Sequence, residues 1–162
     1  MAFDAYLKLD GVEGEATRQG NEKQISLESF SWGAHNPRSP VGTGAGAGRV
    51  EVSNFTVSKK TDKSSPKLFQ HCCSGKHIPT ATLTLLKAGG DKPVDYLKYD
   101  FTELFVGDIQ WSGATNGGDD TPQETVGFSF ATVQITYMTQ KPDGSKGEAV
   151  VAGWDLKSSK SI

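Results

Sequence analysis

Apolar and polar residues alternate along most of this chain, which is the pattern of half-buried β-strands. The first segment is typical, because Ala5, Leu7 and Leu9 are separated by polar or amphipathic residues. Glycine-rich turns such as KAGGDKP and KPDGSKGE separate successive segments. We predict strands near residues 3–9, 23–35, 49–59, 81–87, 96–106, 126–137 and 150–157.

The alternation changes phase by one residue within four of these segments. In one of them, Tyr99 and Phe101 share one parity, and the next apolar residues, Leu104 and Val106, have the other. Such a shift moves the apolar side chains to the opposite face, and its usual cause is a bulge that bends the strand. The other shifts lie within residues 25–32, 50–57 and 126–137. They predict sheets that curl around a core, or strands that pass between packed sheets.

A single segment has the pattern of a helix. Ser64 or Ser65 suits the N-cap, Pro66 suits the first turn, and Gly75 suits the C-terminal stop. We therefore predict a helix over Pro66–Ser74. Its apolar face is expected to comprise Leu68, Phe69, Cys72 and Cys73.

These elements predict a mainly β fold, either a β-barrel or a tight sandwich, with one short α-helix on its flank. We expect one domain over residues 1–162, because 162 residues suffice for one core and no boundary is visible. The aromatic residues expected in this core are Phe30, Trp32, Phe128, Phe130 and Trp154.

The composition limits the kinds of partner that this protein is expected to bind. The 17 basic and 19 acidic residues nearly balance, which gives no case for nucleic-acid binding. No apolar run is long enough for membrane insertion, and the N-terminus lacks the basic, apolar and cleavage regions of a Sec signal. We expect synthesis in the cytoplasm and, for any export, another route.

Two motifs invite a cofactor or metal interpretation, and both fail on context. The glycines of PVGTGAGAG precede a strand and lack the closing Gly-Lys-Ser/Thr of a phosphate-binding loop. Asp119 and Asp120 lack the alternating acidic spacing of a calcium loop. We therefore expect no cofactor.

The cysteines and histidines give a weak enzyme or metal hypothesis. His71, Cys72 and Cys73 are contiguous, with His77 nearby, and contiguous residues do not converge on a tetrahedral metal. A cysteine nucleophile would need a distant base, for which only His35 qualifies. We favour a non-enzymatic protein with a helix that buries its thiols, and a small cysteine hydrolase remains the competing hypothesis.

Several long segments resemble the Hcp (haemolysin-coregulated protein) tube proteins of bacterial type VI secretion. They are MAFDAYLKLDGVEGEA, ISLESFSWGAHNPRSP, the glycine loop followed by RVEVSNFTVSKKTDKSSPKLF, CSGKHIPTATLTLLKAGG and VQITYMTQKPDGSKGEAVVAGWDL. The resemblance covers nearly the whole chain. A tube-like subunit of another contractile injection particle is the alternative.

This resemblance implies two antiparallel sheets that form a β-barrel with one short flanking α-helix, and no fused effector domain. It also implies a structural protein that forms hexameric rings, which stack into a tube. The implied partners are other copies of the chain, a contractile sheath, a spike protein and small effectors carried in the ring, and the protein itself is secreted. It implies that Asn36–Gly48 form a stacking loop and that the predicted helix lines the ring interior. Ser31 is the expected cargo-facing residue. The stacking residues expected in the loop are Pro40, Gly42, Thr43, Gly44, Gly46 and Gly48.

Overall fold

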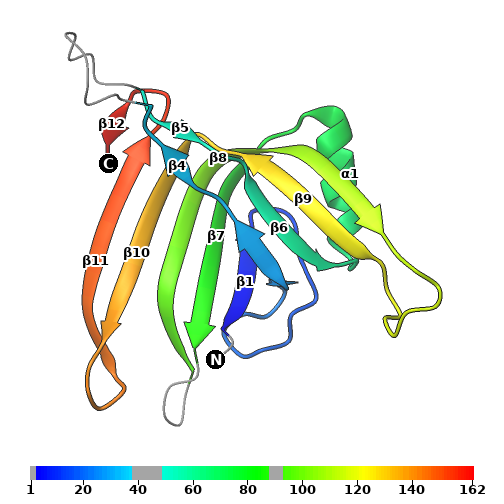
Figure 1. The fold of residues 1–162 in the computed structure, drawn as a ribbon, viewed down its shortest axis with the longest axis horizontal. Helices are drawn as coiled ribbons and strands as arrows, with labels where there is room; N and C mark the ends of the chain where they lie inside the picture. Colours follow the sequence, from blue (N-terminus) through cyan, green and yellow to red (C-terminus); the bar gives the residue numbers. More distant parts are fainter. Residues whose placement is uncertain (1–2, 38–48, 88–92) are drawn as a thin grey trace.

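A computed structural model of the chain describes residues 3–37, 49–87 and 93–162 (Figure 1). Its single described helix is α1 (Ser65–Ser74). The strands are β1 (Asp4–Leu9), β2 (Ile25–Leu27), β3 (Ser29–Ser31), β4 (Ala34–His35), β5 (Glu51–Val52), β6 (Phe55–Lys60), β7 (Ile78–Lys87), β8 (Val94–Ser112), β9 (Gln123–Ser129), β10 (Thr132–Gln140), β11 (Lys146–Asp155) and β12 (Lys160–Ser161).

Antiparallel pairings run around a closed circuit. In one sheet, β2 pairs with β1, β1 with β7, and β7 with the first part of β8. In the other sheet, the last part of β8 pairs with β9, β9 with β6, and β6 with β3. Glu28 alone separates β2 from β3, and its backbone N–H donates to the Ser58 carbonyl oxygen (2.8 Å). The two sheets thus share β8 and the β2–β3 segment, and we call this circuit the barrel.

The phase shifts in the sequence mark the places where the chain passes from one sheet to the other. On β8, Phe101 pairs with Ala81 of β7, whereas Val106 pairs with Phe128 of β9. Glu103 lies between them with a φ of +50°, so the bend occurs where the backbone leaves the extended region. The prediction of strands that pass between two packed sheets is confirmed.

The core lies inside the barrel and is rich in aromatic rings. Phe55 is fully buried and stacks on Phe101 at 4.6 Å and on Phe128 at 5.8 Å between ring centroids. Phe130 is also buried, as predicted. Phe30 and Trp32 are half-buried and pack against this core.

Beyond β8 the first sheet continues into a three-stranded extension formed by β10, β11 and β12, at the left of Figure 1. We call this extension the wing. Trp154 lies on it and keeps 38% of its surface exposed, so its prediction as a core residue is wrong. The reason is that the barrel core ends before this part of β11, leaving the residue on a sheet without a covering layer.

The helix begins and ends close to the predicted residues. Gly75 follows it with a φ of +71°, the left-handed conformation of a C-terminal stop. The predicted apolar face is only partly right. Leu68 and His71 are buried, whereas Phe69 is 50% exposed and Cys73 is exposed. At about 100° per residue, a helix that turns positions 68 and 71 inward turns positions 69 and 73 away.

Candidate functional site

The predicted cargo residue Ser31 lies on an open, polar sheet face. Phe30 and Val57 pair across β3 and β6 and face the core, so their neighbours Ser31 and Thr56 project from the opposite side. The same alternation on β8 and β9 brings further polar residues to this side. We call it the Ser31 face, and it comprises Ser29, Ser31, Thr56, Ser58, Asp108, Gln110, Thr125 and Gly127.

Strand register aligns these residues in two rows that cross all four strands. One row runs Ser29, Ser58, Thr125, Gln110, and the other runs Ser31, Thr56, Gly127, Asp108. Hydroxyl and amide groups make up the first row, and the second row contains two hydroxyl groups, Gly127 and the carboxylate of Asp108. Such a surface hydrogen-bonds readily and carries little charge, so it can contact varied polar surfaces without holding any of them by a large apolar area.

A buried ion-pair cluster lies on the other side of the same sheet. Lys59 Nζ lies 3.1 Å from Glu124 Oε1 and 2.9 Å from Asp62 Oδ1, and it donates to Ser65 Oγ (3.1 Å). Trp111 Nε1 donates to Glu124 Oε2 (2.8 Å). Lys59 and Glu124 are both fully buried, so this cluster ties the start of α1 to β6 and β9.

The helix and Ser31 therefore lie on opposite sides of one sheet. Lys59 holds α1 on the core side, and Phe69 of the helix contacts Trp111 at 5.9 Å between ring centroids. One sheet cannot turn both of its sides toward the same ring interior. The two expectations, a cargo-facing Ser31 and an interior helix, are incompatible.

The wing carries a second candidate surface. The core-facing side of β8 continues across β10 and β11 in register, and this continuation is apolar. The rows are Phe101–Val133–Trp154, Tyr99–Ile135–Ala152 and Leu97–Tyr137–Val150. Away from the barrel these side chains become exposed to solvent, and 43% of the surface of Tyr137 and 56% of that of Val150 are accessible. We call this side of the wing the inner wing face. No layer of the described residues covers its outermost side chains.

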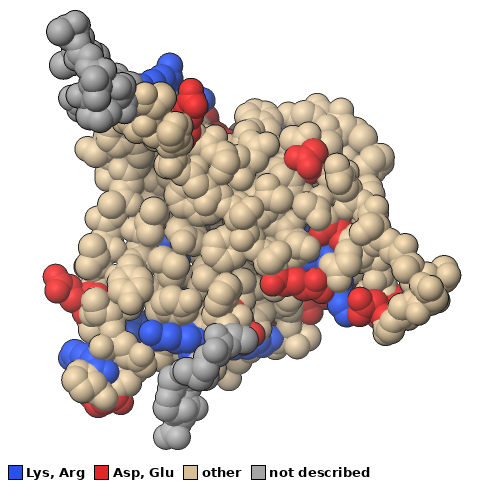
Figure 2. Space-filling model, in the orientation of Figure 1, with Lys and Arg blue, Asp and Glu red and all other residues tan. Residues whose placement is uncertain are grey.

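A groove of about 400 Å³ runs along the inner wing face. Trp32 and Val52 border it on one side, and Ile135 and Trp154 on the other. In Figure 2 the surface over β4 and β10 is almost free of Lys, Arg, Asp and Glu, and charged groups gather at its upper edge beside β5. An apolar, uncharged groove on a sheet extension is suited to binding another protein surface.

The predicted stacking residues Pro40, Gly42, Thr43, Gly44, Gly46 and Gly48 lie outside the described residues. The strands on either side of them are described. β4 and β5 pair with each other, with Ala34 opposite Val52 and His35 opposite Glu51. Asn36 and Val50, which follow and precede these strands, both border the groove on the inner wing face.

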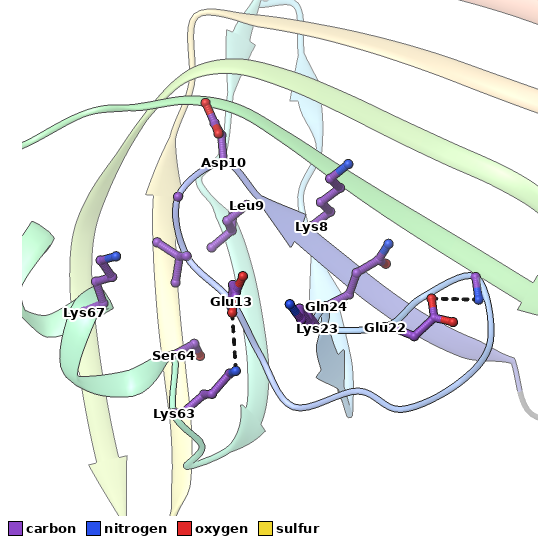
Figure 3. Close-up of a pocket in the computed structure, with 13 residues that line it drawn as sticks. Lys8, Leu9, Asp10, Glu13, Glu22, Lys23, Gln24, Lys63, Ser64 and Lys67 are labelled. Carbon is purple, nitrogen blue, oxygen red and sulfur yellow. Dashed lines mark hydrogen bonds and ion pairs between the residues drawn. The ribbon is translucent and has the colours of Figure 1, made fainter.

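Another hollow, of about 680 Å³, lies between the loops after β1 and the start of α1 (Figure 3). Its lining carries both signs of charge, with Lys63 Nζ paired to Glu13 Oε2 at 3.4 Å. The Glu22 carboxylate accepts from the Gly20 N–H (2.9 Å). The charged residues of the lining are Lys8, Asp10, Glu13, Glu22, Lys23, Lys63 and Lys67. Surface charges that alternate in sign favour no particular ligand.

The side chains of the cysteine and histidine cluster differ in their exposure. Cys72 is half-buried and Cys73 exposed, so the expectation that both thiols are buried is wrong for Cys73. Burial, with the nearby charges of Lys76 and Lys67, lowers the pKa of His71. Within residues 3–37, 49–87 and 93–162, no group of three or more His, Cys, Asp and Glu side chains is placed to hold a metal ion. In the same ranges, no helix has the length and apolar character to cross a membrane.

Comparison with known proteins gives concordant results. Residues 6–137 match the family described as type VI secretion system effector, Hcp. Protein hcp1 of Pseudomonas aeruginosa is 39% identical over 159 residues, covering 97% of each chain. The crystal structure of Hcp1 from Salmonella typhimurium is 39% identical with a TM-score of 0.84, covering 100% of both chains. A structure described as a type six secretion system protein is 36% identical with a TM-score of 0.92, covering 99% of this chain and 100% of the other. The chain therefore belongs to the Hcp family, whose members are structural tube proteins of type VI secretion and not enzymes.

Proposed function

We propose that six copies of this chain close into a ring through the inner wing face, and that the rings stack into the inner tube of a type VI secretion system. In this arrangement the wing of one copy covers part of the barrel of the next. The contact is head-to-tail, which closes into a ring when the rotation between copies is one sixth of a turn.

The observation that supports this proposal best is the uncovered apolar row on the wing. Tyr137, Val150 and Trp154 are all more than a third exposed. Trp154 nevertheless continues the row of the buried Phe101 and Val133, and Tyr137 and Val150 continue the row of the half-buried Leu97. A sheet that buries one face in the barrel and exposes the same face beyond it is suited to a second copy as its missing layer.

In the ring we place the Ser31 face toward the lumen and α1 on the outside. The assignment follows from their opposite positions on one sheet, with the expectation for Ser31 retained and that for the helix abandoned. Small effector proteins would then pass or bind against a surface of hydroxyl and amide groups. The outer surface around α1 would face the contractile sheath, and a spike protein would close the end of the tube.

We assign stacking to residues Asn36–Gly48, because Asn36 at their start and Val50 shortly after their end both border the groove. Their glycine content allows close backbone approach to a neighbouring ring or subunit. The assembled tube would be propelled out of the cell, so the protein would reach the medium or a target cell without a Sec signal.

Negative-stain imaging of the purified protein tests this proposal. We expect annular particles with six-fold symmetry and an open centre, and images of separate single subunits would contradict it. A variant lacking Thr43–Gly48 is expected to keep the annulus but to block secretion from a cell that carries the system. Normal secretion of that variant would contradict the proposed role of the loop in stacking. The proposal of a six-membered ring would then still be tested by the images alone.

A further inference from the structure

One ionisable side chain interrupts the Ser31 face. Asp108 ends the row that contains Ser31, Thr56 and Gly127, and it lies on β8 directly after an irregularity in the pairing with β9. The carboxylate is exposed, and no residue in the described part of the chain gives it a hydrogen bond or an ion pair. It is therefore free to bind a cationic group from outside the subunit.

Gly127 makes room for this carboxylate within the row. A Cβ added at residue 127 would overlap the Asp108 carboxylate, so the acid lies over β9 and not away from the sheet. Its charge is consequently placed between β8 and Thr56, beside the hydroxyl groups of the row. A carboxylate flanked by hydroxyls matches the donor pattern of an ammonium or guanidinium group, which carries several N–H bonds and no acceptor.

Two other charged groups near this face have partners within the subunit. Lys60 projects on the same side, two residues beyond Ser58, and its Nζ lies 3.3 Å from Asp119 Oδ1. Glu28 accepts from Gln123 Nε2 (3.3 Å) at the same end of the sheet. Glu28 thus keeps its negative charge, and Asp108 is the one carboxylate among the eight residues of the Ser31 face, without a partner among the described residues.

We propose that Asp108, with the row it shares with Ser31, selects cargo by charge, and that its ligand is a segment of a small effector bearing Lys or Arg side chains. This inference rests on the proposed function, because it needs the Ser31 face to line the ring. Six subunits would then place six carboxylates at one height in the lumen, where their summed field attracts a basic segment more strongly than one carboxylate does.

Binding of two labelled peptides to purified rings tests this selection. One peptide consists of Gly-Ser-Lys repeats and the other of Gly-Ser-Glu repeats, and fluorescence anisotropy reports their affinity at low ionic strength. The variants are Asp108→Asn, the gain variant Gln110→Asp in the adjacent row, and Asp10→Asn, which removes an equal charge from an exposed loop outside the face. Light scattering confirms the ring mass of every sample first.

We expect wild-type and Asp10→Asn rings to bind the lysine peptide alike and to prefer it over the glutamate peptide. Asp108→Asn should weaken lysine-peptide binding about tenfold, as for loss of a charge-assisted hydrogen bond, and Gln110→Asp should strengthen it. The inference would be overturned if intact rings bound the two peptides equally, or if the substitutions at residues 108 and 110 did not change the affinity for the lysine peptide. Either result would leave the proposed ring unaffected. Absence of rings from the wild-type sample would overturn the proposed function and the inference with it.

Discussion

The barrel and the wing are built from one continuous sheet but differ in what covers it. In the barrel, Leu83 and Phe101 are fully buried beneath the second sheet. On the wing, Tyr137 and Val150 lie on the same side of the sheet and are about half exposed. The strands, their spacing and their apolar character are similar in the two regions. What differs is the second layer, which the described residues form over the barrel but not over Tyr137 and Val150 of the wing.

This difference assigns separate roles to the two regions. The barrel contains the closed pairing circuit and the aromatic core, so its stability is expected to be a property of one subunit. The wing exposes apolar surface that costs free energy in water, at about 25 cal/mol per Å². Covering it by another copy removes that cost, so the wing is expected to determine assembly and not folding.

The largest effect is expected in the barrel core. Replacing Phe55 by alanine removes a ring that stacks on two others, and should lower the free energy of unfolding by about 3–5 kcal/mol. Urea denaturation measures this change. The control is Val151→Ala on the exposed outer side of the wing, which should change stability by less than about 0.5 kcal/mol. Equal losses in both variants would remove the distinction between barrel and wing.

The next effect concerns the buried ion pair beneath the Ser31 face. Lys59→Met leaves Glu124 and Asp62 without their cation and should cost about 3 kcal/mol. Lys60→Met is the matched control, because Lys60 is the next residue, is 48% exposed and pairs only at the surface. It should cost less than about 1 kcal/mol. Similar unfolding curves for the two variants would show that the buried cluster does not stabilise the barrel.

Two adjacent valines of β11 allow the two sides of the wing to be tested separately. Val150 projects from the inner wing face and Val151 from the opposite side, with 56% and 50% of their surfaces exposed. Val150→Asp should reduce the native mass from that of a ring to that of a subunit, because it buries a charge in the proposed contact. Val151→Asp should leave the ring intact, and both variants should unfold within about 1 kcal/mol of the wild type. Loss of the ring in Val151→Asp but not in Val150→Asp would place the contact between subunits on the side of the wing opposite the inner wing face.

The smallest effect is a pH dependence at the edge of the wing. Asp95 Oδ1 on β8 lies 2.6 Å from Lys146 Nζ on β11. Burial raises the pKa of Asp95, but the hydrogen bond and charge of Lys146, with the charge of Lys98, outweigh it and hold the pKa below its ordinary 3.8. The folded state therefore favours the ionised form, so this stabilisation is present above the ordinary pKa and is lost as the pH falls through the lower, folded value.

Asp95→Asn should accordingly lower stability by less than about 1 kcal/mol at neutral pH, because Lys146 is half exposed. Thermal unfolding of both proteins across a pH series measures the difference. It should stay constant at neutral pH and shrink below about pH 4. A difference that grows on acidification would have the wrong sign for this pair.

Much of the barrel was predictable from the alternation of apolar residues. The strands, the single helix and the bends at the phase shifts follow from local pattern, because burial inside a barrel selects one side of each strand. The exposure of Trp154 was not predictable in this way. Its apolar alternation is the same whether the covering layer comes from the same chain or from another, so the pattern alone made it a core residue.

The buried charges illustrate a second limit. Lys59 and Glu124 occupy inward positions of their strands, two residues from Val57 and Val126. The alternation in the sequence shows that both residues point inward, but the ion pair between them depends on the register between β6 and β9. The row that joins Ser31 to Asp108 depends on three such registers. Contacts between residues so far apart in the chain are set by tertiary pairing, which a single sequence does not reveal.

The native mass of the purified protein tests the central claim most directly. Light scattering on a sizing column should give six times the subunit mass of 17.3 kDa, because the wing of each copy is then covered by the next. A mass of one subunit across the accessible concentrations would contradict the account, since it would show that the inner wing face is stable in water without a partner.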